Sequence, residues 1–371
     1  MPSPLKRAAS AVLGALAMGW LLLALVEGSP AHALEAYKEM LWGGIGDFPR
    51  YFEGAPASVW LRPWGESAVK ATLLTLTGLS VAVGLRAGLF NVGAQGQLLW
   101  GALGAAWVGA LGPWASVLHI ALALSTAALA GGLWASVAAT LREWRGVHEV
   151  ISTILLNWVA LSLIENWLVP GPLRAGGASG ASIAGTAEIV ASAQLPRLLG
   201  ETSRLHAGFP LAVALCVGVW IWLSRSTHGW ETKAVGLNLL AAETAGIATR
   251  ARRVQAMFVS GALAGLAGAV WVLGTEGKYP AHLGAPYGFD GIAMALIGQL
   301  HPLGVFLASV LFGVLRAGGA RMQLVGVHPS YPELLQAFAL IGVAALAAPR
   351  MLKFRRKRKD SSSQVPRVAQ S

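Results

Sequence analysis

The sequence predicts an all-α membrane protein whose helices cross the bilayer repeatedly. Of its 371 residues, 55% are hydrophobic and only 12% are charged, and the mean hydropathy is +0.59, whereas an ordinary soluble domain is about a quarter charged. Apolar runs of about 18 to 20 residues, long enough to cross a bilayer as a helix, recur along the chain. The 46 glycines and 15 tryptophans fit close helix packing in lipid and an aromatic belt at its interfaces.

The N-terminal region, residues 1–26, is expected to form the first transmembrane helix. Lys6 and Arg7 precede an apolar run, and a small-residue A-x-A pattern follows at 31–33, as in a cleaved signal peptide. The apolar run has about 19 residues, whereas the apolar region of a signal peptide has about 7 to 15. We therefore favour an uncleaved helix with its N-terminus in the cytoplasm, followed by an external segment over residues 27–67.

Residues 68–349 are expected to form the core of the protein. Its apolar helices are expected at 68–85, 98–111, 115–141, 150–169, 209–224, 254–273, 291–300, 303–317 and 332–348. Together with the first helix this gives about ten crossings, with weak similarity between two halves and helices broken near the midplane. Merging the two short pieces between 290 and 317 would give nine crossings instead. An external loop over 170–207 is expected to be partly helical near 194–199.

The net charge of +11 is concentrated in a few places. Residues 350–371 hold eight of the 28 lysines and arginines, directly after the last apolar run. Such a run favours a cytoplasmic tail in contact with anionic lipid over a nucleic-acid-binding segment. The ten-helix count places this tail inside, whereas nine would place it outside. The ten-helix count also places Arg316 and Arg321 outside, against the usual preference of arginine for the cytoplasmic side. The loop over 225–253 is the densest internal basic cluster and is expected to face the cytoplasm as well.

A polar, glycine-rich break interrupts the apolar sequence between 84 and 109. It contains Phe90, Asn91, Gln95 and Gln97 between two apolar runs. Backbone without regular hydrogen bonds is tolerated at membrane depth only where it is buried in protein or lines a water-filled cavity. The break therefore predicts part of a pathway for a polar, uncharged solute, since amides both donate and accept hydrogen bonds. The alternative is a tight turn whose amides cap helix ends.

Two further groups of polar residues are candidates for the same pathway. Asn157 lies inside an apolar helix, where an ordinary interhelical hydrogen bond is the alternative. Phe289, Asp290 and Gln299 surround a second break, where the aspartate could simply cap a helix. The Phe-Asn pair at 90 and the Phe-Asp pair at 289 are each followed by glycine and an apolar run, which is a faint internal repeat. Paired interrupted segments are the best pointer in a sequence to a transporter site.

The segment ETKAVGLNLLAAETAGI, residues 231–247, is expected to contact another protein. It has alanine and leucine at helical spacing and a glycine near each end, as in a short surface helix made for docking. The alternative is an ordinary interhelical loop, although the loop is longer than one turn requires.

The sequence contains no recognisable catalytic, metal or nucleotide site. The Gly277–Lys278 pair is followed by Tyr279, where a phosphate-binding loop needs serine or threonine. The single cysteine, Cys216, permits no disulfide framework. We therefore expect no cofactor and no enzymatic activity in this chain. An ion-driven secondary transporter remains an alternative, although acidic candidates at midplane are few, and a membrane-embedded enzyme is a weaker one.

Five blocks of sequence resemble a known family. They are GLFNVGAQGQLLWGALGA, HEVISTILLNW, KAVGLNLLAAETAGI, SGALAGLAGAVWVLG and GFDGIAMALIGQLHPLGVFLASVLFGVLRAGG. In this order they resemble permease subunits of ABC importers in the branched-chain amino acid and simple sugar permease superfamily, nearest to its nucleoside-type members. The resemblance covers about 68–349. Gln95 stands where relatives often carry glutamate, which weakens any requirement for an acid there.

The resemblance implies a partner for each face of the membrane. Two ATPase subunits that bind ATP would dock in the cytoplasm, a second related permease would complete the pathway, and a solute-binding protein or lipoprotein would deliver solute outside a bacterial inner membrane. The solute would be a nucleoside or, alternatively, a ribose-type sugar. By resemblance, the ATPase would contact a coupling helix, whose residues we take as Glu231, Gly236, Asn238, Ala241, Ala242 and Gly246.

Overall fold

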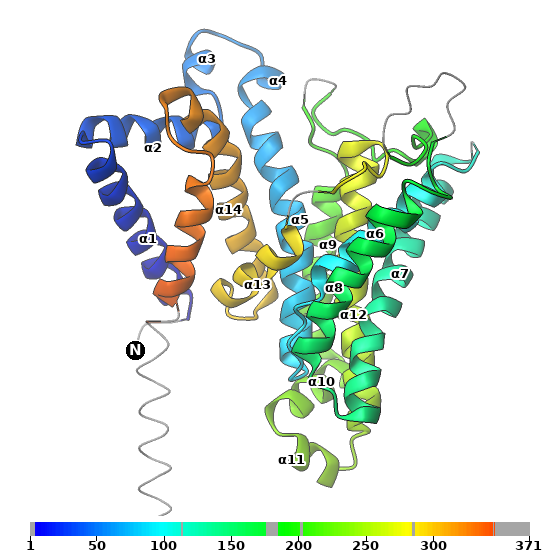
Figure 1. Cartoon of the computed structure of the whole chain (residues 1–371). Helices are drawn as coiled ribbons and strands as arrows, with labels where there is room; N and C mark the ends of the chain where they lie inside the picture. Colours follow the sequence, from blue (N-terminus) through cyan, green and yellow to red (C-terminus); the bar gives the residue numbers. More distant parts are fainter. Residues whose placement is uncertain are drawn as a thin grey trace, which may run out of the picture. The chain divides into compact units, whose positions relative to one another are not determined.

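The computed structural model describes residues 4–112, 114–175, 185–200, 203–283, 286–343 and 345. Within these residues the regular elements are helices, and β-structure is limited to isolated bridges (Figure 1). The predicted all-α class is confirmed. The expected basic tail, residues 350–371, lies outside the described residues. The chain divides into two units, residues 1–34 with 330–371 and residues 35–329, which we describe separately.

The first unit contains two apolar helices from the two ends of the chain. They are α1 (Pro4–Val26) and a helix over Tyr331–Val343. Gly342 lies against Ala11 of α1, because a Cβ at 342 would be 3.2 Å from the Ala11 Cβ. These two helices correspond to the first and last helices expected from the sequence.

The second unit contains the remaining helices. The first of them are α2 (Pro30–Ile45, which begins in the first unit), α3 (Phe48–Phe52), α4 (Ala57–Trp60), α5 (Arg62–Arg86), α6 (Ala94–Gly109), α7 (Ser116–Arg145) and α8 (Glu149–Leu163). The others are α9 (Gly208–Arg225), α10 (Thr227–Leu237), α11 (Leu239–Thr244), α12 (Thr249–Trp271), α13 (Tyr287–Ile297) and α14 (Pro302–Met322). Single π-helical turns extend α8 over Ile164–Leu168 and α12 over Val272–Glu276.

Helices α5 and α12 form the centre of the second unit. In the most apolar 18-residue stretch of each, 89% of the residues of α5 and 78% of those of α12 are buried. The corresponding share is only 28% in α7, α8 and α9. The exposed apolar side chains of these outer helices are the surface expected of helices that face lipid. Six helices in the described residues are long and apolar enough to cross a membrane, which confirms a polytopic protein.

The expected count of about ten crossings is not confirmed, because two of the predicted helices are short. Helix α13 has 11 residues and so measures about 16 Å, roughly half the hydrocarbon thickness of a bilayer. Helix α6 has 16 residues and measures about 24 Å. Each follows an irregular segment, as expected for helices that begin inside the protein rather than at its surface.

Small residues bring α12 close to α7. A Cβ added to Gly261 would overlap the carbonyl oxygen of Gly131, and one added to Gly265 would overlap that of Ala127. Glycine at these positions lets two helix backbones approach more closely than larger residues would allow. The helix α12 is thereby held at the centre of the unit.

The segment before α5, expected to be external over 27–67, contains the three helices α2, α3 and α4. Helix α2 packs on α14, with Gly318 against the carbonyl oxygen of Met40. Arg321 near the end of α14 pairs with Glu39 at 2.7 Å and with Asp47 at 3.0 Å. These pairs neutralise an arginine that the ten-crossing count placed on the outer side. Helix α5 begins at Arg62, within the expected external segment, with a proline in its first turn.

The expectation of helix near 194–199 was wrong. The structure has a 3₁₀ turn just before it, at Ala191–Ala193, and Arg197 forms an isolated antiparallel bridge with His206. Pro196 explains the difference, because proline disfavours helical backbone at the preceding residue. The loop is therefore tied to the start of α9 by backbone pairing.

His206 fixes the start of α9 and should make the protein sensitive to acid. Its ring is 1% exposed, and its Nδ1 accepts a hydrogen bond from the Gly208 N–H at 3.1 Å. Burial, assisted by the positive charge of Arg197, lowers the pKa of His206 to about 4 from a usual value of 6.5. Below pH 6.5 the unfolded chain binds a proton that the folded chain does not, so stability falls with pH, by up to about 3 kcal/mol at pH 4.

We expect the thermal unfolding midpoint of the detergent-solubilised protein to fall more steeply between about pH 7 and pH 4.5 in the native chain than in His206→Asn. Asparagine keeps a side-chain acceptor for the amide of residue 208 but does not titrate in this range. Identical pH dependence in the two proteins would show that folding does not lower the pKa of His206.

Candidate functional site

The first predicted break lies between α5 and α6. Helix α5 ends at Arg86, and Gly88 has φ +72°, a left-handed conformation that favours glycine. The chain then turns back into the unit, where the Asn91 Nδ2 donates to the Oγ of Ser260, in the middle of α12, at 2.8 Å. Helix α6 therefore begins inside the bundle, and residues 89 and 91–93 of the break are buried in protein, as required at membrane depth.

Three of the predicted pathway amides stabilise this break. Asn91 and Gln97 exchange two hydrogen bonds, of 2.8 and 2.9 Å. The Oδ1 of Asn157 accepts from the Gly96 N–H at 2.8 Å, and its Nδ2 donates to the carbonyl oxygen of Val92 at 2.9 Å. All three side chains are buried. In this conformation the three amides form hydrogen bonds within the turn and at the start of α6, as in the alternative of a tight turn with capping amides. They do not face a solute path.

The second break lies between α12 and α13. Gly277 ends the π-helical turn of α12 with φ +72°, and the returning segment is held by Glu165 of the π-helical turn after α8. The Glu165 carboxylate accepts from the Leu283 N–H at 2.9 Å and from the Tyr279 hydroxyl at 3.3 Å, and its Oε2 lies 2.9 Å from the His282 Nδ1. Helix α13 then begins at Tyr287, and again the break precedes a short helix.

The two breaks meet at the first turns of α6 and α13. The Gly288 N–H donates to the Gln95 Oε1 at 2.8 Å, and a Cβ at 288 would overlap the backbone nitrogen of Gln95. Helix α13 then runs toward the end of α5, where the Arg86 Nε donates to the Leu300 carbonyl oxygen at 3.2 Å. Helix α6 runs the opposite way, and its end, Gly109, lies against Leu273 of α12. We call this meeting point the half-helix junction.

The half-helix junction exposes aromatic and amide side chains. Phe289 of α13 is 44% exposed, and Gln95 of α6 is partly exposed, as is Phe90, which lies four residues before α6. Asp290 is not the residue that caps α13, since Pro286 occupies that position. Its carboxylate instead pairs with Arg316 of α14 at 2.7 Å, with side chains 12% and 10% exposed.

Gln299 is not brought to the half-helix junction. It lies beyond the far end of α13, next to Leu300, and both residues have positive φ, +54° and +57°. Two residues at the junction were not predicted as parts of the site, Arg316 and Tyr287, whose ring centre lies 5.7 Å from the Arg316 guanidinium carbon. A charge inside an apolar helix was the available signal for Arg316.

The predicted coupling helix consists of two short helices, α10 and α11. Asn238 separates them and caps α11, its Oδ1 accepting from the Ala241 N–H at 3.1 Å. Gly246 follows α11 with φ +80°. Ala242 is buried, Ala241 is exposed, and the apolar side chains of Leu237 and Leu240 are 87% and 73% exposed. Such exposed leucines at the tip of a helical pair are expected at a protein-binding surface.

Helix α10 contacts the turn that starts the first break. A Cβ at Gly236 would overlap the carbonyl oxygen of Arg86, and one at Gly88 would lie 3.2 Å from the Gly236 Cα. Glu231 of α10 also pairs with Arg252 of α12. In Figure 1, α10 and α11 lie together at one end of the second unit, next to the ends of α5 and α7.

Short helices that begin at buried breaks in a multi-pass bundle are a recurring feature of membrane transport proteins. Residues 65–344 match the family described as branched-chain amino acid transport system / permease component. The chain belongs to this family of permease components, and the resemblance predicted from the five sequence blocks is confirmed.

Three similar proteins are permeases of ABC transporters. The guanosine permease protein NupP of Bacillus subtilis is 36% identical over 95% of this chain and 96% of its own length. The glucose permease protein TsgB13 of Haloferax volcanii is 34% identical over 74% of each chain. The nucleoside permease protein NupB of Lactococcus lactis is 32% identical over 76% of this chain and 79% of its own. No solved structure matches the chain.

Proposed function

We propose that this chain is a transmembrane permease subunit of an ATP-driven ABC importer that carries nucleosides into a bacterial cell. The observation that carries the proposal is the half-helix junction, where Gly288 donates to Gln95 between two oppositely directed short helices. Family membership supports the permease role. Two of the three similar proteins above are named for guanosine or nucleosides, which supports the solute class.

The exposed side of the half-helix junction suits a solute with an aromatic base. Phe90 and Phe289 offer apolar ring surface against which a planar base can stack. The N-terminal ends of α6 and α13 carry partial positive charge, which favours the carbonyl oxygens and ring nitrogens of a purine. Asp290 is balanced by Arg316, so the nearby charges neutralise each other, as suits a neutral solute.

Phe289→Ala tests this assignment with a matched control. We expect the variant to raise the KM for guanosine uptake by about tenfold, because removing a stacked ring forfeits roughly 1 to 2 kcal/mol. Leu303→Ala on α14 removes an apolar side chain that is equally exposed, 44% in both cases, and should leave the KM within about twofold. An unchanged KM in Phe289→Ala would remove this residue from the solute site.

The end of the unit that carries α10 and α11 is proposed to face the cytoplasm. Residues 225–253, from the last residue of α9 to the first turns of α12, contain five basic residues, Arg225, Lys233, Arg250, Arg252 and Arg253. Such basic clusters between membrane helices are typical of the cytoplasmic side. Both chain termini are proposed to be cytoplasmic as well, because basic residues precede the first apolar run and follow the last one. The exposed Leu237 and Leu240 would bind an ATPase subunit, which supplies the ATP site. A second, related permease and an external solute-binding protein or lipoprotein would complete the importer.

Transport is proposed to proceed by alternating access. Closure of the ATPase dimer on ATP would move α10 and α11, and the contact of Gly236 with Arg86 and Gly88 would pass this movement to the first break. The two permeases would then switch between inward-facing and outward-facing states. Such a switch requires partners that bind the two states with different affinity, and the ATPases and the solute-binding protein would provide that difference.

Uptake of labelled guanosine, inosine and ribose tests the solute class. Cells with and without this chain, all containing the other importer subunits, would be compared, together with cells whose ATPase is inactive. We expect the chain to be required for guanosine and inosine uptake and not for ribose uptake. Ribose uptake alone would favour the sugar alternative, and uptake that persists with the inactive ATPase would favour an ion-driven transporter.

A further inference from the structure

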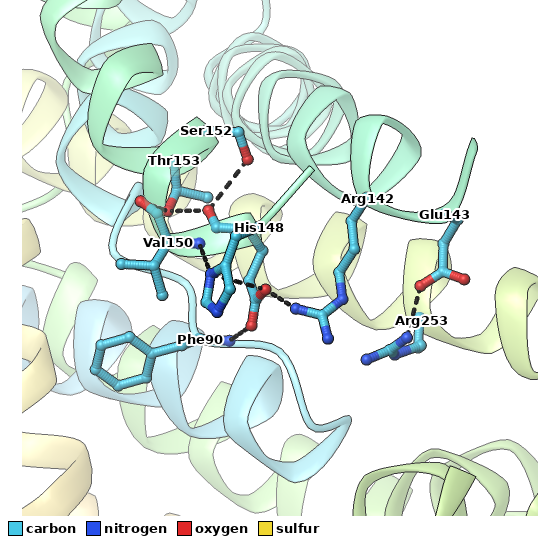
Figure 2. Close-up of polar contacts among 9 residues, drawn as sticks. Phe90, Arg142, Glu143, His148, Val150, Ser152, Thr153 and Arg253 are labelled. Atoms are coloured by element: carbon cyan, nitrogen blue, oxygen red, sulfur yellow. Dashed lines mark hydrogen bonds and ion pairs between the residues drawn. The ribbon is translucent and has the colours of Figure 1, made fainter. Parts of the chain in front are cut away.

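The carboxylate of Glu149 joins three separate segments. Glu149 is the first residue of α8 and is 5% exposed. Its Oε1 accepts from the Phe90 N–H of the first break at 3.3 Å, and its Oε2 pairs with Arg142 of α7 (Figure 2). The ring Nδ1 of the exposed His148 lies 3.5 Å from the same oxygen. The carboxylate therefore links the backbone of residue 90 to the end of α7.

A role in capping does not account for this arrangement. A carboxylate in the first turn of a helix is favourable even when it is exposed, because it lies near the positive end of the helix dipole. Here the carboxylate is buried and turned toward a backbone N–H far away in the sequence. The main chain of Glu149 is also fixed, because its carbonyl oxygen accepts from Ser152 and Thr153, at 3.1 and 2.7 Å. The position of Phe90 thus depends on α8 and on Arg142.

Two further ion pairs extend from the end of α7 to α10. Glu143, next to Arg142, pairs with Arg253 of α12 at 2.8 Å, and these side chains are 9% and 10% exposed (Figure 2). Arg252 pairs with Glu231 of α10. The nearly buried Glu143–Arg253 pair is weakly screened by salt, whereas the Glu231–Arg252 pair is partly exposed. Together with the Arg142–Glu149 pair, these ion pairs hold α7, α8, α10 and α12 in a defined arrangement.

The turn at the start of the first break is contacted from two sides. On one side, Gly236 of α10 packs against the backbone of Arg86 and Gly88. On the other, Glu149 holds the backbone of Phe90. The three ion pairs connect these two sides through α12 and α7. A displacement of α10 would therefore act on the same turn by packing and by the ion pairs.

We propose that Glu149 is a positioning residue that makes Phe90, and with it the half-helix junction, follow the movement of α10 and α11. The ion pairs Glu231–Arg252, Arg253–Glu143 and Arg142–Glu149 carry this coupling. The inference rests on the proposed function, because it requires an ATPase that moves α10 and α11. Glu149 does not contact the solute and acts through Phe90.

The test uses the complete importer reconstituted in liposomes, with guanosine uptake and ATP hydrolysis measured together. Glu149→Gln keeps the size of the side chain and removes its charge. We expect the guanosine transported per ATP hydrolysed to fall about tenfold, while ATP hydrolysis itself stays within about twofold, since the coupling between α10 and the first break is lost. Glu143→Gln, which does not touch Phe90, should lower the same ratio. Glu188→Gln, whose side chain is 80% exposed, should not.

A second readout separates coupling from a purely structural role. Hydrogen exchange of residues 87–93 is measured with and without a non-hydrolysable ATP analogue. We expect its protection to change with the analogue in the native complex and to stay constant in Glu149→Gln. The double variant Arg142→Glu with Glu149→Arg, which reverses the ion pair, should not regain the lost ratio, because arginine has no acceptor for the Phe90 N–H.

Three results would overturn the inference. They are a normal ratio in Glu149→Gln, a normal ratio in Glu143→Gln, and an unchanged response of residues 87–93 to the analogue in Glu149→Gln. A native complex without ATP-dependent guanosine uptake would instead contradict the proposed function, so the two failures are distinguishable.

Discussion

Replacing Gly236 with valine should abolish transport while the protein still inserts into the membrane. A Cβ at this position would overlap the carbonyl oxygen of Arg86 and approach the backbone nitrogen of Gly88 to 2.8 Å. Backbone atoms at the end of a packed helix cannot move aside as the tip of a flexible side chain can, so α10 must shift away from the first break. We expect guanosine uptake to fall at least about a hundredfold, because a displacement of about 1 Å suffices for such losses.

Gly218→Val is the matched control for this change. Gly218 lies in α9, and a Cβ there would meet no atom within 4 Å, so the same substitution should leave uptake within about twofold. Gly236→Ala should be intermediate in effect. The amount of each variant in purified membranes separates a loss of transport from a loss of protein. Normal uptake by Gly236→Val would mean that α10 does not act on the first break.

The positions of the breaks could be predicted from the sequence, because glycine and amide side chains interrupt long apolar runs. The segment around Asn91 was recognised, whereas the second break, expected to start at Phe289 and Asp290, lies before α13, which begins at Tyr287. The structure joins the two breaks at Gln95 and Gly288. What could not be predicted was which amides would be buried. Asn91, Gln97 and Asn157 bond one another or the turn, and a sequence does not show whether an amide faces a path or its own backbone.

Charge partners were the second part that the sequence left open. Arg316 and Arg321 conflicted with the expected topology because each was considered alone. In the structure Arg316 meets Asp290, and Arg321 meets Glu39 and Asp47. Such pairs join residues far apart in the chain, so local periodicity contains no information about them. The same holds for Glu149, whose partner Phe90 N–H lies in a different segment.

Helix length explains why the number of crossings was harder to predict than the helices themselves. Apolar composition marks α13 as a membrane helix, yet its 11 residues reach only about half of the bilayer. The chain that precedes it contributes buried residues of its own, among them Tyr279 and Leu283. A count of apolar runs therefore treats a short helix, preceded by a segment without regular secondary structure, as a full crossing.

Replacing Asp290 with asparagine should produce the largest loss of stability among single changes at the half-helix junction. Asp290 and Arg316 are 12% and 10% exposed, at 2.7 Å, so the change removes the carboxylate that neutralises a buried guanidinium. Removing one partner of such a pair costs about 3 to 5 kcal/mol. We expect the thermal unfolding midpoint in detergent to fall by roughly 5 to 10 °C, and guanosine uptake to fall with it.

Two comparisons decide what the ion pair at the junction does. Glu188→Gln breaks an exposed pair, with Lys278 at 3.9 Å, and should change the midpoint by no more than about 1 °C because exposed pairs contribute little. Asp290→Leu combined with Arg316→Met replaces both charges with apolar groups and should restore most of the stability. Because that variant leaves an apolar wall beside the proposed path of a polar solute, we expect uptake to stay low. Full recovery of uptake together with stability would show that the pair serves folding alone.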